Sequence, residues 1–327
     1  MIQVDALIIG AGPIGGYLAK KLCQAGYTVL MIEEHNQIGR PFQCAGLVNP
    51  GSMEKVGLES TALTRIWGAR IHGPGGTLVE IGSPERTRTW SVCRKLFDEA
   101  VVAQAISAGG SLMLNSTPKG TSISEEYVVT TISTDNTELT VKSKVVLGCD
   151  GAHSWVRRYH RMGRVRETMI GFQIDVTGYL HKEGKLDMYT GQQIAPGFFA
   201  WAIPTGTTTR IGTFSRPDLL GGKSSEETLA ELLNHKLWKD RFEGCSEVGR
   251  YCGPVPAKPI KKPAIGRILL FGDAAGLCKP TTGGGIGPGF THIDNSMALV
   301  STLIESNNVD FNATDRWARQ ILSLIHI

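Results

Sequence analysis

Three features that would assign this sequence to other classes of protein are absent from it. Although the net charge is +4, no block of consecutive Lys or Arg forms a nucleic-acid footprint, so we expect no nucleic-acid partner. The seven cysteines lie far apart with no C-x-x-C pair, which argues against a disulfide framework and against a metal site. No run approaches the ~18 apolar residues that a membrane-spanning helix needs.

The two ends of the sequence lead to expectations about localisation and about the length of the natural protein. The first expected strand begins almost at Met1, which leaves no room for a signal peptide. We therefore expect a cytoplasmic protein that at most rests on a membrane surface. The last six residues, LSLIHI, follow an amphipathic segment from Asp310 to Ile321 without a cap or a stop signal. This ending predicts that the C-terminal part of the natural protein is missing from the sequence.

The chain opens with a pattern typical of a dinucleotide-binding βαβ unit. VDALIIGAG reads as a buried strand, a helix with one apolar face follows, and TVLMIEE reads as a second strand. Gly10, Gly12 and Gly15 form a G-x-G-x-x-G fingerprint between strand and helix. They allow a tight turn, close approach of a pyrophosphate, and close packing of the helix on the strand. Glu33, at the end of the second strand, is placed to accept hydrogen bonds from a ribose.

The rest of the chain alternates between helical and strand-like patterns. RIHGPGGTLVEI predicts a hairpin through Pro74 to Gly76, CRKLFDEAVVAQAISAGG a helix, and residues 111–148 a β meander. We expect a second, β-rich lobe from about Gly171 to Gly253, with a helix around Glu226–Trp238. A strand and turn at GRILLFGDAAG precede a glycine-rich loop and a helix to about Ile304.

Two further motifs follow strands later in the chain. Asp150 and Gly151 make a sharp turn in LGCDGAHSWVRR, and Asp273 follows the buried strand ILLF. The bare backbone of Gly283 to Gly285, ahead of a helix, allows a flat ring to lie against N–H groups near the positive end of the helix dipole.

The order of these motifs resembles the flavoprotein superfamily of para-hydroxybenzoate hydroxylase. Within it the sequence is most similar to the geranylgeranyl reductase family, which includes archaeal digeranylgeranylglycerophospholipid reductases. The resemblance implies an α/β fold in which a Rossmann-like FAD-binding domain (GR2-type) is interleaved with a β-rich substrate domain. It implies FAD contacts from Gly10, Gly12, Pro13, Gly15, Glu33, Glu34, Arg40, Ala45, Arg94, Asp150, Gly151, Asp273, Gly284, Gly285, Ile286 and Gly287. We expect the FAD-binding domain to comprise residues 1–64, 91–166 and 263–327, and the substrate domain residues 65–90 and 167–262.

Two more segments match this family. PFQCAGLV resembles the reductases' Cys-small-Gly segment that faces the flavin where the substrate alkene docks. Because a thiol can relay a proton when its pKa is perturbed, Cys44 is our candidate catalytic residue. PGFFAWAIP resembles the substrate motif Tyr-x-Trp-x-Phe-Pro, with Trp201 and Pro204 retained. Phe199 and Ile203 depart from it, and we expect Phe199, Trp201 and Pro204 to bind substrate.

The resemblance implies an enzyme that saturates isolated C=C bonds of geranylgeranyl chains in lipid precursors by hydride transfer from N5 of reduced flavin. FAD would be reduced by NAD(P)H or by a ferredoxin-like donor, so a redox protein is a further expected partner. No second G-x-G-x-x-G is present for a separate nicotinamide domain. An insoluble isoprenoid substrate predicts peripheral contact with a membrane surface.

Other functions of the same superfamily stay open at this point. FFAWAIP also resembles the Trp-x-Trp-x-Ile-Pro of flavin-dependent halogenases. Those enzymes need a lysine between flavin and substrate, and no lysine lies between Val56 and Arg94. An aromatic hydroxylase would use O₂ and a phenol, and a flavin-binding sensor or electron carrier would need no large apolar cavity.

Overall fold

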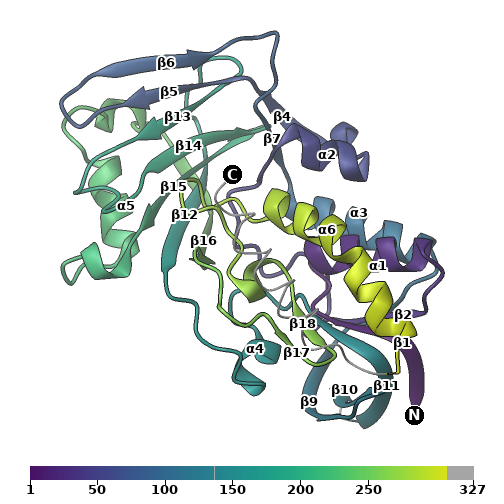
Figure 1. Cartoon of the computed structure of the whole chain (residues 1–327). Helices are drawn as coiled ribbons and strands as arrows, with labels where there is room; N and C mark the ends of the chain where they lie inside the picture. Colours follow the sequence, from purple (N-terminus) through teal and green to yellow (C-terminus); the bar gives the residue numbers. More distant parts are fainter. Residues whose placement is uncertain (136, 308–327) are drawn as a thin grey trace. The chain divides into compact units, whose positions relative to one another are not determined.

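A computed structural model describes residues 1–135 and 137–307, so LSLIHI and the amphipathic segment before it lie outside the described residues (Figure 1). Contacts divide the chain into two compact units. Unit 1 comprises residues 1–40, 97–167 and 256–327, and unit 2 comprises residues 41–96 and 168–255. Among the described residues, no helix is both long and apolar enough to cross a bilayer.

Unit 1 is an α/β unit built on an eight-stranded sheet. Its strands are β1 (Ile2–Ile9), β2 (Val29–Ile32), β8 (Ser111–Met113), β9 (Ser116–Ile123), β10 (Val128–Thr134), β11 (Thr137–Gly148), β17 (Ala264–Ile265) and β18 (Ile268–Leu270). Its helices are α1 (Pro13–Gln24), α3 (Arg94–Ser107, of which the first residues belong to unit 2), α4 (Trp155–Tyr159) and α6 (Ile286–Glu305). Strands β18, β11, β1, β2 and β8 are parallel neighbours in that order, and β9 and β10 extend β11 as an antiparallel meander.

The glycines of the opening turn set how closely α1 approaches β1. Gly10 has a φ of +98°, and a Cβ there would lie 2.5 Å from the carbonyl oxygen of Cys149. A Cβ on Gly15 would lie 2.0 Å from the carbonyl oxygen of Gly10. Because no side chain fits in either place, only glycine permits this turn and this helix packing.

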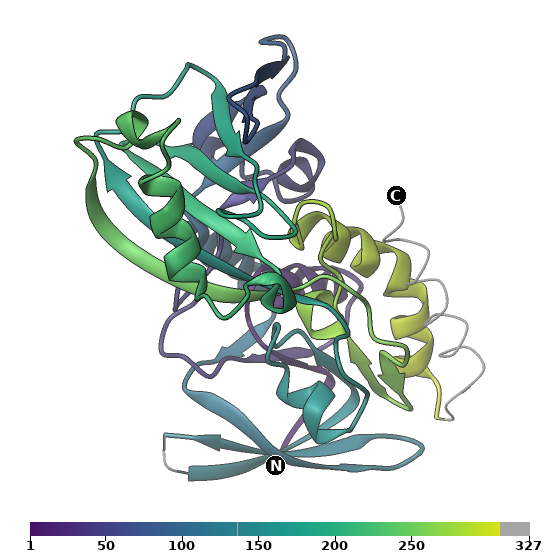
Figure 2. The same cartoon turned by 90° about the vertical axis from the view of Figure 1, so that its left-hand side faces the viewer.

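Unit 2 is built on a seven-stranded sheet in the order β16-β12-β15-β14-β13-β5-β6, with a small sheet β3-β7-β4. The strands are β3 (Leu47–Val48), β4 (Ala62–Ile66), β5 (Gly68–His72), β6 (Leu78–Gly82), β7 (Thr89–Val92), β12 (Thr168–Thr177), β13 (Lys185–Tyr189), β14 (Ala200–Thr205), β15 (Thr208–Ser215) and β16 (Ser246–Pro256). The helices are α2 (Pro50–Val56) and α5 (Ser225–Leu233), and Figure 2 shows α5 lying across one face of the larger sheet.

Both faces of the larger sheet are packed, because side chains alternate along β14. Ala200 and Ala202 belong to a core cluster that includes Leu229 and Leu232 of α5. Trp201 and Ile203 belong to a second cluster on the other face. The expected hairpin is confirmed as β5 and β6, which pair antiparallel from His72 opposite Leu78 to Gly68 opposite Gly82.

The structure places three segments differently from our expected domain boundaries. Residues 41–64 and 91–96, expected with the FAD-binding domain, belong to unit 2. The reason is the small sheet, in which Leu47 pairs with Ser91 and Arg65 with Trp90. Residues 256–262 lie in unit 1 rather than with the substrate domain.

The helix expected around Glu226–Trp238 is shorter in the structure, and its predicted end is wrong. Helix α5 begins at a capping box, in which the Ser224 side chain accepts from the backbone N–H of Glu227 and the Glu227 side chain accepts from that of Ser224. It ends at Leu233 because Trp238, 4% exposed, turns into the core and stacks on His235 at 4.1 Å.

Candidate functional site

The polar and glycine motifs of unit 1 meet at one edge of its sheet. The turn at Gly10 follows β1, Glu33 follows β2, Asp150 follows β11 and Asp273 follows β18. Since these four strands are parallel, their carboxyl ends share an edge, which is where open α/β sheets bind ligands.

The first turn of α1 is left open for an anion. Gly12 is the N-cap residue, no side chain caps the helix, and the first turn holds no acidic residue. A Cβ on Gly12 would find nothing within 4 Å among the described residues. Pro13, which lacks an N–H, occupies the first helical position. An uncapped helix N-terminus beside open space is suited to a pyrophosphate.

Glu33 is fixed against the same turn. Its Oε2 accepts from the backbone N–H of Ala11 at 3.0 Å, and its Oε1 lies 2.6 Å from Nδ1 of His35. Glu34 and Arg40 are exposed, and Glu34 lies 3.9 Å from Nε2 of the same histidine.

The Asp150 turn is tied to the Asp273 turn by one buried arginine. Oδ2 of Asp150 accepts from the N–H of Val156 at 2.9 Å, and burial raises the pKa of the Asp150 carboxyl. Arg157 donates to the carbonyl oxygens of Ala152 and Ala274 at 2.6 and 2.8 Å. Gly151, with a φ of +70°, has open space where a side chain would be.

The glycine loop is packed against Asp273. The Cys278 thiol donates to Oδ1 of Asp273 at 3.2 Å, and a Cβ on Gly285 would lie 2.8 Å from that oxygen. Gly284 is exposed. Ile286 and Gly287 open α6, whose N-terminus has no side-chain cap and no acidic residue in its first turn.

These features fit FAD. The uncapped start of α1 suits its pyrophosphate, Glu33 beside it suits the ribose, and the bare loop before α6 suits a flat, electron-rich ring. Of the predicted contacts, Ala45 and Arg94 belong to unit 2, with Arg94 the first residue of α3.

The segment that carries Cys44 is held by Arg210, which forms an ion pair with Asp175 and was not predicted from the sequence. Arg210 on β15, 5% exposed, donates to the carbonyl oxygen of Ala45 at 3.0 Å and lies 4.4 Å from the centre of the Phe42 ring. Its other nitrogens bind both oxygens of Asp175 on β12, at 2.8 and 3.1 Å. The only signal in the sequence is an arginine within a strand of apolar and Thr residues.

Close packing leaves no room for a side chain beside this arginine. Gly46 has a φ of +77°, and a Cβ there would lie 2.7 Å from the carbonyl oxygen of Val92 and 2.8 Å from a guanidinium nitrogen of Arg210. The N–H of Gly46 donates to Sγ of Cys44 at 3.4 Å, and Cys44 is half-buried. The small residues predicted beside Cys44 therefore also serve this packing.

The two segments of unit 2 that match the family meet in one apolar cluster. Trp201 and Ile203 of β14 are buried there, with Phe199 packed beside them. Ala45 and Leu47, from the Cys44 segment, pack against the same cluster. The Trp201 ring lies over Gly212, where a Cβ would approach within 2.5 Å, and its indole N–H has no acceptor among the described residues. Pro204 is buried in β14.

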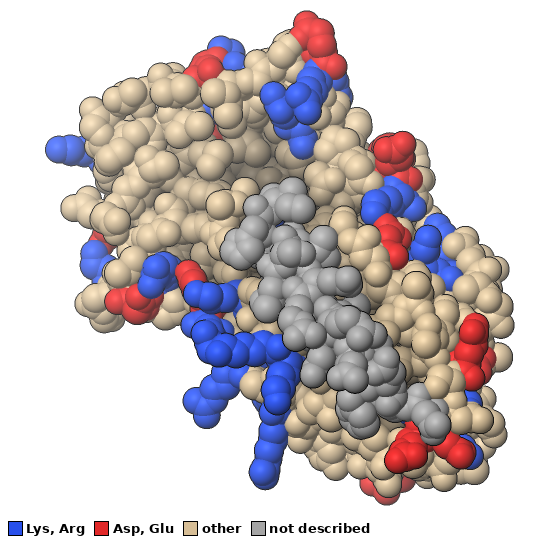
Figure 3. Space-filling model, viewed as in Figure 1, with Lys and Arg blue, Asp and Glu red and all other residues tan. Residues whose placement is uncertain are grey.

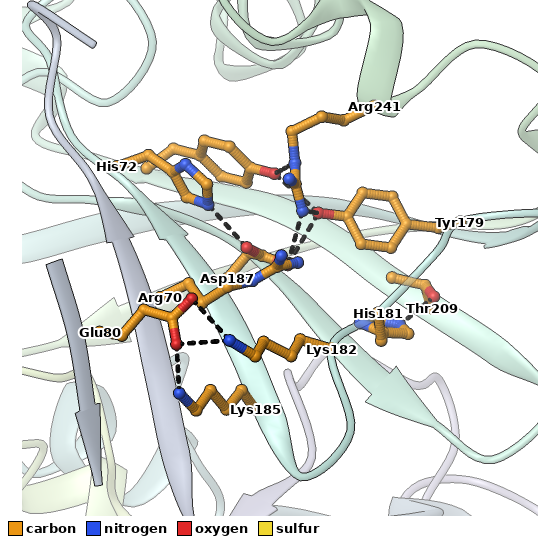
Figure 4. Close-up of polar contacts among 11 residues, drawn as sticks. Arg70, His72, Glu80, Tyr179, His181, Lys182, Lys185, Asp187, Thr209 and Arg241 are labelled. Atoms are coloured by element: carbon orange, nitrogen blue, oxygen red, sulfur yellow. Dashed lines mark hydrogen bonds and ion pairs between the residues drawn. The ribbon is translucent and has the colours of Figure 1, made fainter. Parts of the chain in front are cut away.

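The opposite face of the same sheet carries a polar cluster centred on Asp187 (Figure 4). This fully buried carboxylate binds Arg70 at 2.7 Å, His72 at 2.6 Å, Tyr179 at 2.9 Å and Arg241 at 3.1 Å. Burial alone would raise the pKa of Asp187, but these hydrogen bonds and charges hold it below its usual range. The cluster joins β5 and β13 to the segment after α5, so its role is structural.

Comparison with known proteins decides among the related families. The profile of the FAD binding domain family matches residues 3–308. The digeranylgeranylglycerophospholipid reductase of Methanosarcina acetivorans is 30% identical over 297 residues, which cover 86% of this chain and 71% of the relative. The digeranylgeranylglycerophospholipid reductase of Methanocaldococcus jannaschii is 29% identical over 290 residues, which cover 86% of this chain and 73% of the relative. The chain belongs to the FAD-binding geranylgeranyl reductase family. It is an FAD-dependent oxidoreductase.

Solved structures agree on the fold without choosing a function. A geranylgeranyl bacteriochlorophyll reductase-like protein from Thermoplasma acidophilum has a TM-score of 0.84 at 23% identity, covering 99% of this chain and 83% of that one. A flavin-dependent brominase has a TM-score of 0.80 at 18% identity, and the match covers 97% of this chain and 84% of the brominase chain. Because reductases and brominases share this fold, the choice between them comes from the reductase relatives.

Proposed function

We propose that this protein saturates isolated C=C bonds of geranylgeranyl chains in lipid precursors. The similarity at 30% identity to a digeranylgeranylglycerophospholipid reductase is the observation that carries the proposal. The apolar cluster that joins Trp201 to the Cys44 segment supports it, because a hydrocarbon chain needs a surface without charges.

Saturation of a C=C bond adds a hydride to one carbon and a proton to the other. When bound and reduced, FAD would supply the hydride for one carbon of a trisubstituted alkene, and the other carbon would gain the proton. We propose that Cys44 delivers that proton, with Arg210 holding its segment through the Ala45 carbonyl. Phe199, Trp201 and Pro204 would hold the chain, since positioning must supply much of the rate for an unactivated alkene.

The remaining partners belong to the same proposal. FAD would receive its electrons from NAD(P)H or from a ferredoxin-like protein. The lipid substrate would bring the enzyme into peripheral contact with a membrane, so more protein should pellet with anionic liposomes than for an unrelated soluble control. Equal pelleting would contradict the membrane contact.

An anaerobic reaction tests the function directly. The purified protein with FAD is reduced by dithionite and given digeranylgeranylglycerol phospholipid or geranylgeranyl diphosphate. Reoxidation of the flavin with a product heavier by two hydrogens for each bond reduced supports the reductase. A reduced flavin that ignores both lipids but turns over with O₂ and an aromatic acceptor would replace the proposal with a halogenase or hydroxylase.

A further inference from the structure

A row of apolar side chains crosses the sheet of unit 2 from Trp201 to its edge. Strand register places Met188 of β13 beside Trp201, Ile71 of β5 beside Met188, and Val79 of β6 beside Ile71. Side chains of directly paired residues lie on one face of a sheet. We call these four residues the apolar row. It spans three strand spacings, roughly 14 Å.

Exposure rises step by step along the apolar row. Trp201 is 3% exposed, Met188 and Ile71 are half-buried, and Val79 is 48% exposed. Ile81, two residues further along β6 on the same face, is 51% exposed. Figure 3 shows mostly uncharged surface in the region of β5 and β6. The row thus connects the buried Trp201 cluster to solvent without a charged group along it.

The loop that follows the outermost strand carries cations. Strand β6 is the edge strand, and the loop after it contains the exposed Arg86 and Arg88. Arg65 binds this loop through the Pro84 carbonyl and the Thr87 hydroxyl. Three arginines against the single Glu85 of this loop favour an anionic group beside the Ile81 end of β6.

We propose that the apolar row is the path of the substrate's isoprenoid chain beyond Trp201. The phosphate-bearing head of the lipid lies at Arg65, Arg86 and Arg88, the first isoprene units cross β6 at Val79, and the distal units reach Trp201. This inference rests on the proposed function. It assigns to Val79, an exposed residue far from the family's sequence motifs, a part in substrate binding.

The edge strand offers a matched pair of variants. Val79 and its neighbour Leu78 are 48% and 50% exposed, but they lie on opposite faces of β6. We expect Val79→Asp to raise KM about tenfold or more for geranylgeranyl diphosphate and for the phospholipid, because a chain on this face would have to contact a charge. Leu78→Asp should change KM less than twofold. Equal effects of the two variants would overturn the proposal.

Photoaffinity labelling tests the path without turnover. One geranylgeranyl diphosphate probe carries a diazirine on the isoprene unit nearest the head, and a second carries it at the far end of the chain. The first should label β6 and the second should label β13 and β14, with labelling of β6 lost in Val79→Asp. A set of labels on the α5 side, in the cavity of 530 Å³ lined by Ile174, Leu233 and Phe242, would overturn it.

The two proposals fail in different ways. Labels on the predicted strands without lipid-dependent flavin reoxidation would contradict the reductase function and keep the apolar row as a lipid-binding surface. Flavin reoxidation by lipid, together with photolabels on other elements, would support the reductase function and contradict the apolar row as the path of the chain.

Discussion

Cys44 lies on a segment shaped by its neighbours rather than by its own contacts. Gly46 fits between Val92 and Arg210, and its N–H points to the Cys44 sulfur. The thiol is half-buried, so it can be reached by a substrate while its backbone stays fixed. This combination is what proton delivery to one carbon of an alkene requires.

Replacing Cys44 by Ser tests that role. General acid–base assistance contributes about 100-fold or more, so kcat for alkene reduction should fall by at least that factor while FAD affinity stays unchanged. Single-turnover flavin reoxidation and FAD titration measure the two quantities. Cys252→Ser, at an exposed cysteine of the same unit, is the control, and unimpaired reduction by Cys44→Ser would remove the catalytic role.

Arg210 is expected to act as a positioning residue. Arg210→Met leaves the half-buried Asp175 carboxylate without its partner and should cost about 3 kcal/mol of unfolding free energy. Adding Asp175→Leu should restore most of that loss, measured by denaturant unfolding. The double variant should nevertheless keep a reduced kcat and an altered rate of Cys44 alkylation, since the Ala45 carbonyl still lacks its donor. Recovery of kcat together with stability would show that the pair is merely structural.

At the scale of elements, the two helices that begin at the proposed cofactor edge have open N-termini. Neither α1 nor α6 has a side-chain cap, although capping stabilises helices by about 1 kcal/mol. Unused capping positions at both helices are consistent with an anionic or electron-rich ligand taking that place.

A side chain at Gly12 should block the cofactor and spare the fold. Its φ is −75°, which any residue adopts, and a Cβ would enter open space. We expect Gly12→Val to raise the dissociation constant of FAD about tenfold or more, with little change in Tm of the apoprotein. Flavin fluorescence titration and thermal unfolding measure these. Wild-type affinity in the variant would contradict a pyrophosphate at this turn.

The far end of α6 depends on Arg267. This fully buried guanidinium donates to the carbonyl oxygens of Leu303 and Ser306 at the helix end, and to those of Glu125 and Lys144. A helix C-terminus leaves such carbonyls without partners. Arg267→Met should therefore lower the unfolding free energy by about 3 kcal/mol. Denaturant unfolding of the variant, beside an exposed Arg161→Met, measures this, and equal stability of the two would refute it.

At the scale of the whole molecule, acid should destabilise the fold through His292. Burial lowers the pKa of this fully buried histidine from 6.5 to about 3. The unfolded chain therefore binds the proton first as pH falls. The stability contribution is complete above about pH 6.5 and is lost progressively toward pH 3, at about 1.4 kcal/mol per pH unit.

Unfolding free energies measured at pH 7 and pH 5 test this. Stability should fall between these values in the wild type and fall less in His292→Leu, which removes the group that titrates. Asp187, whose pKa is held low, should add to the loss only at lower pH. Parallel pH dependence of wild type and variant would exclude His292 as the cause.

Much of unit 1 could be read from the sequence, because its signals are local. A strand, a glycine turn and a helix follow one another at Gly10 to Gly15, and parallel strands bring their ends to one edge whatever their order. The hairpin β5–β6 was equally predictable, since Pro74 to Gly76 lie between its strands. The end of α5 could not be predicted, because Trp238 packs into a core formed by strands that are distant in sequence.

The sequence alone determined the flavin family, the motifs at the sheet edge and the residues of the Cys44 and Trp201 segments. Only the tertiary structure decided what holds and joins them. Asp175 pairs with Arg210 across neighbouring strands. Trp201, Met188, Ile71 and Val79 lie side by side through pairing of strands up to 117 residues apart in sequence, as between Met188 and Ile71. Strand partners are chosen by register and by burial of whole faces, and no local pattern along the chain records that choice.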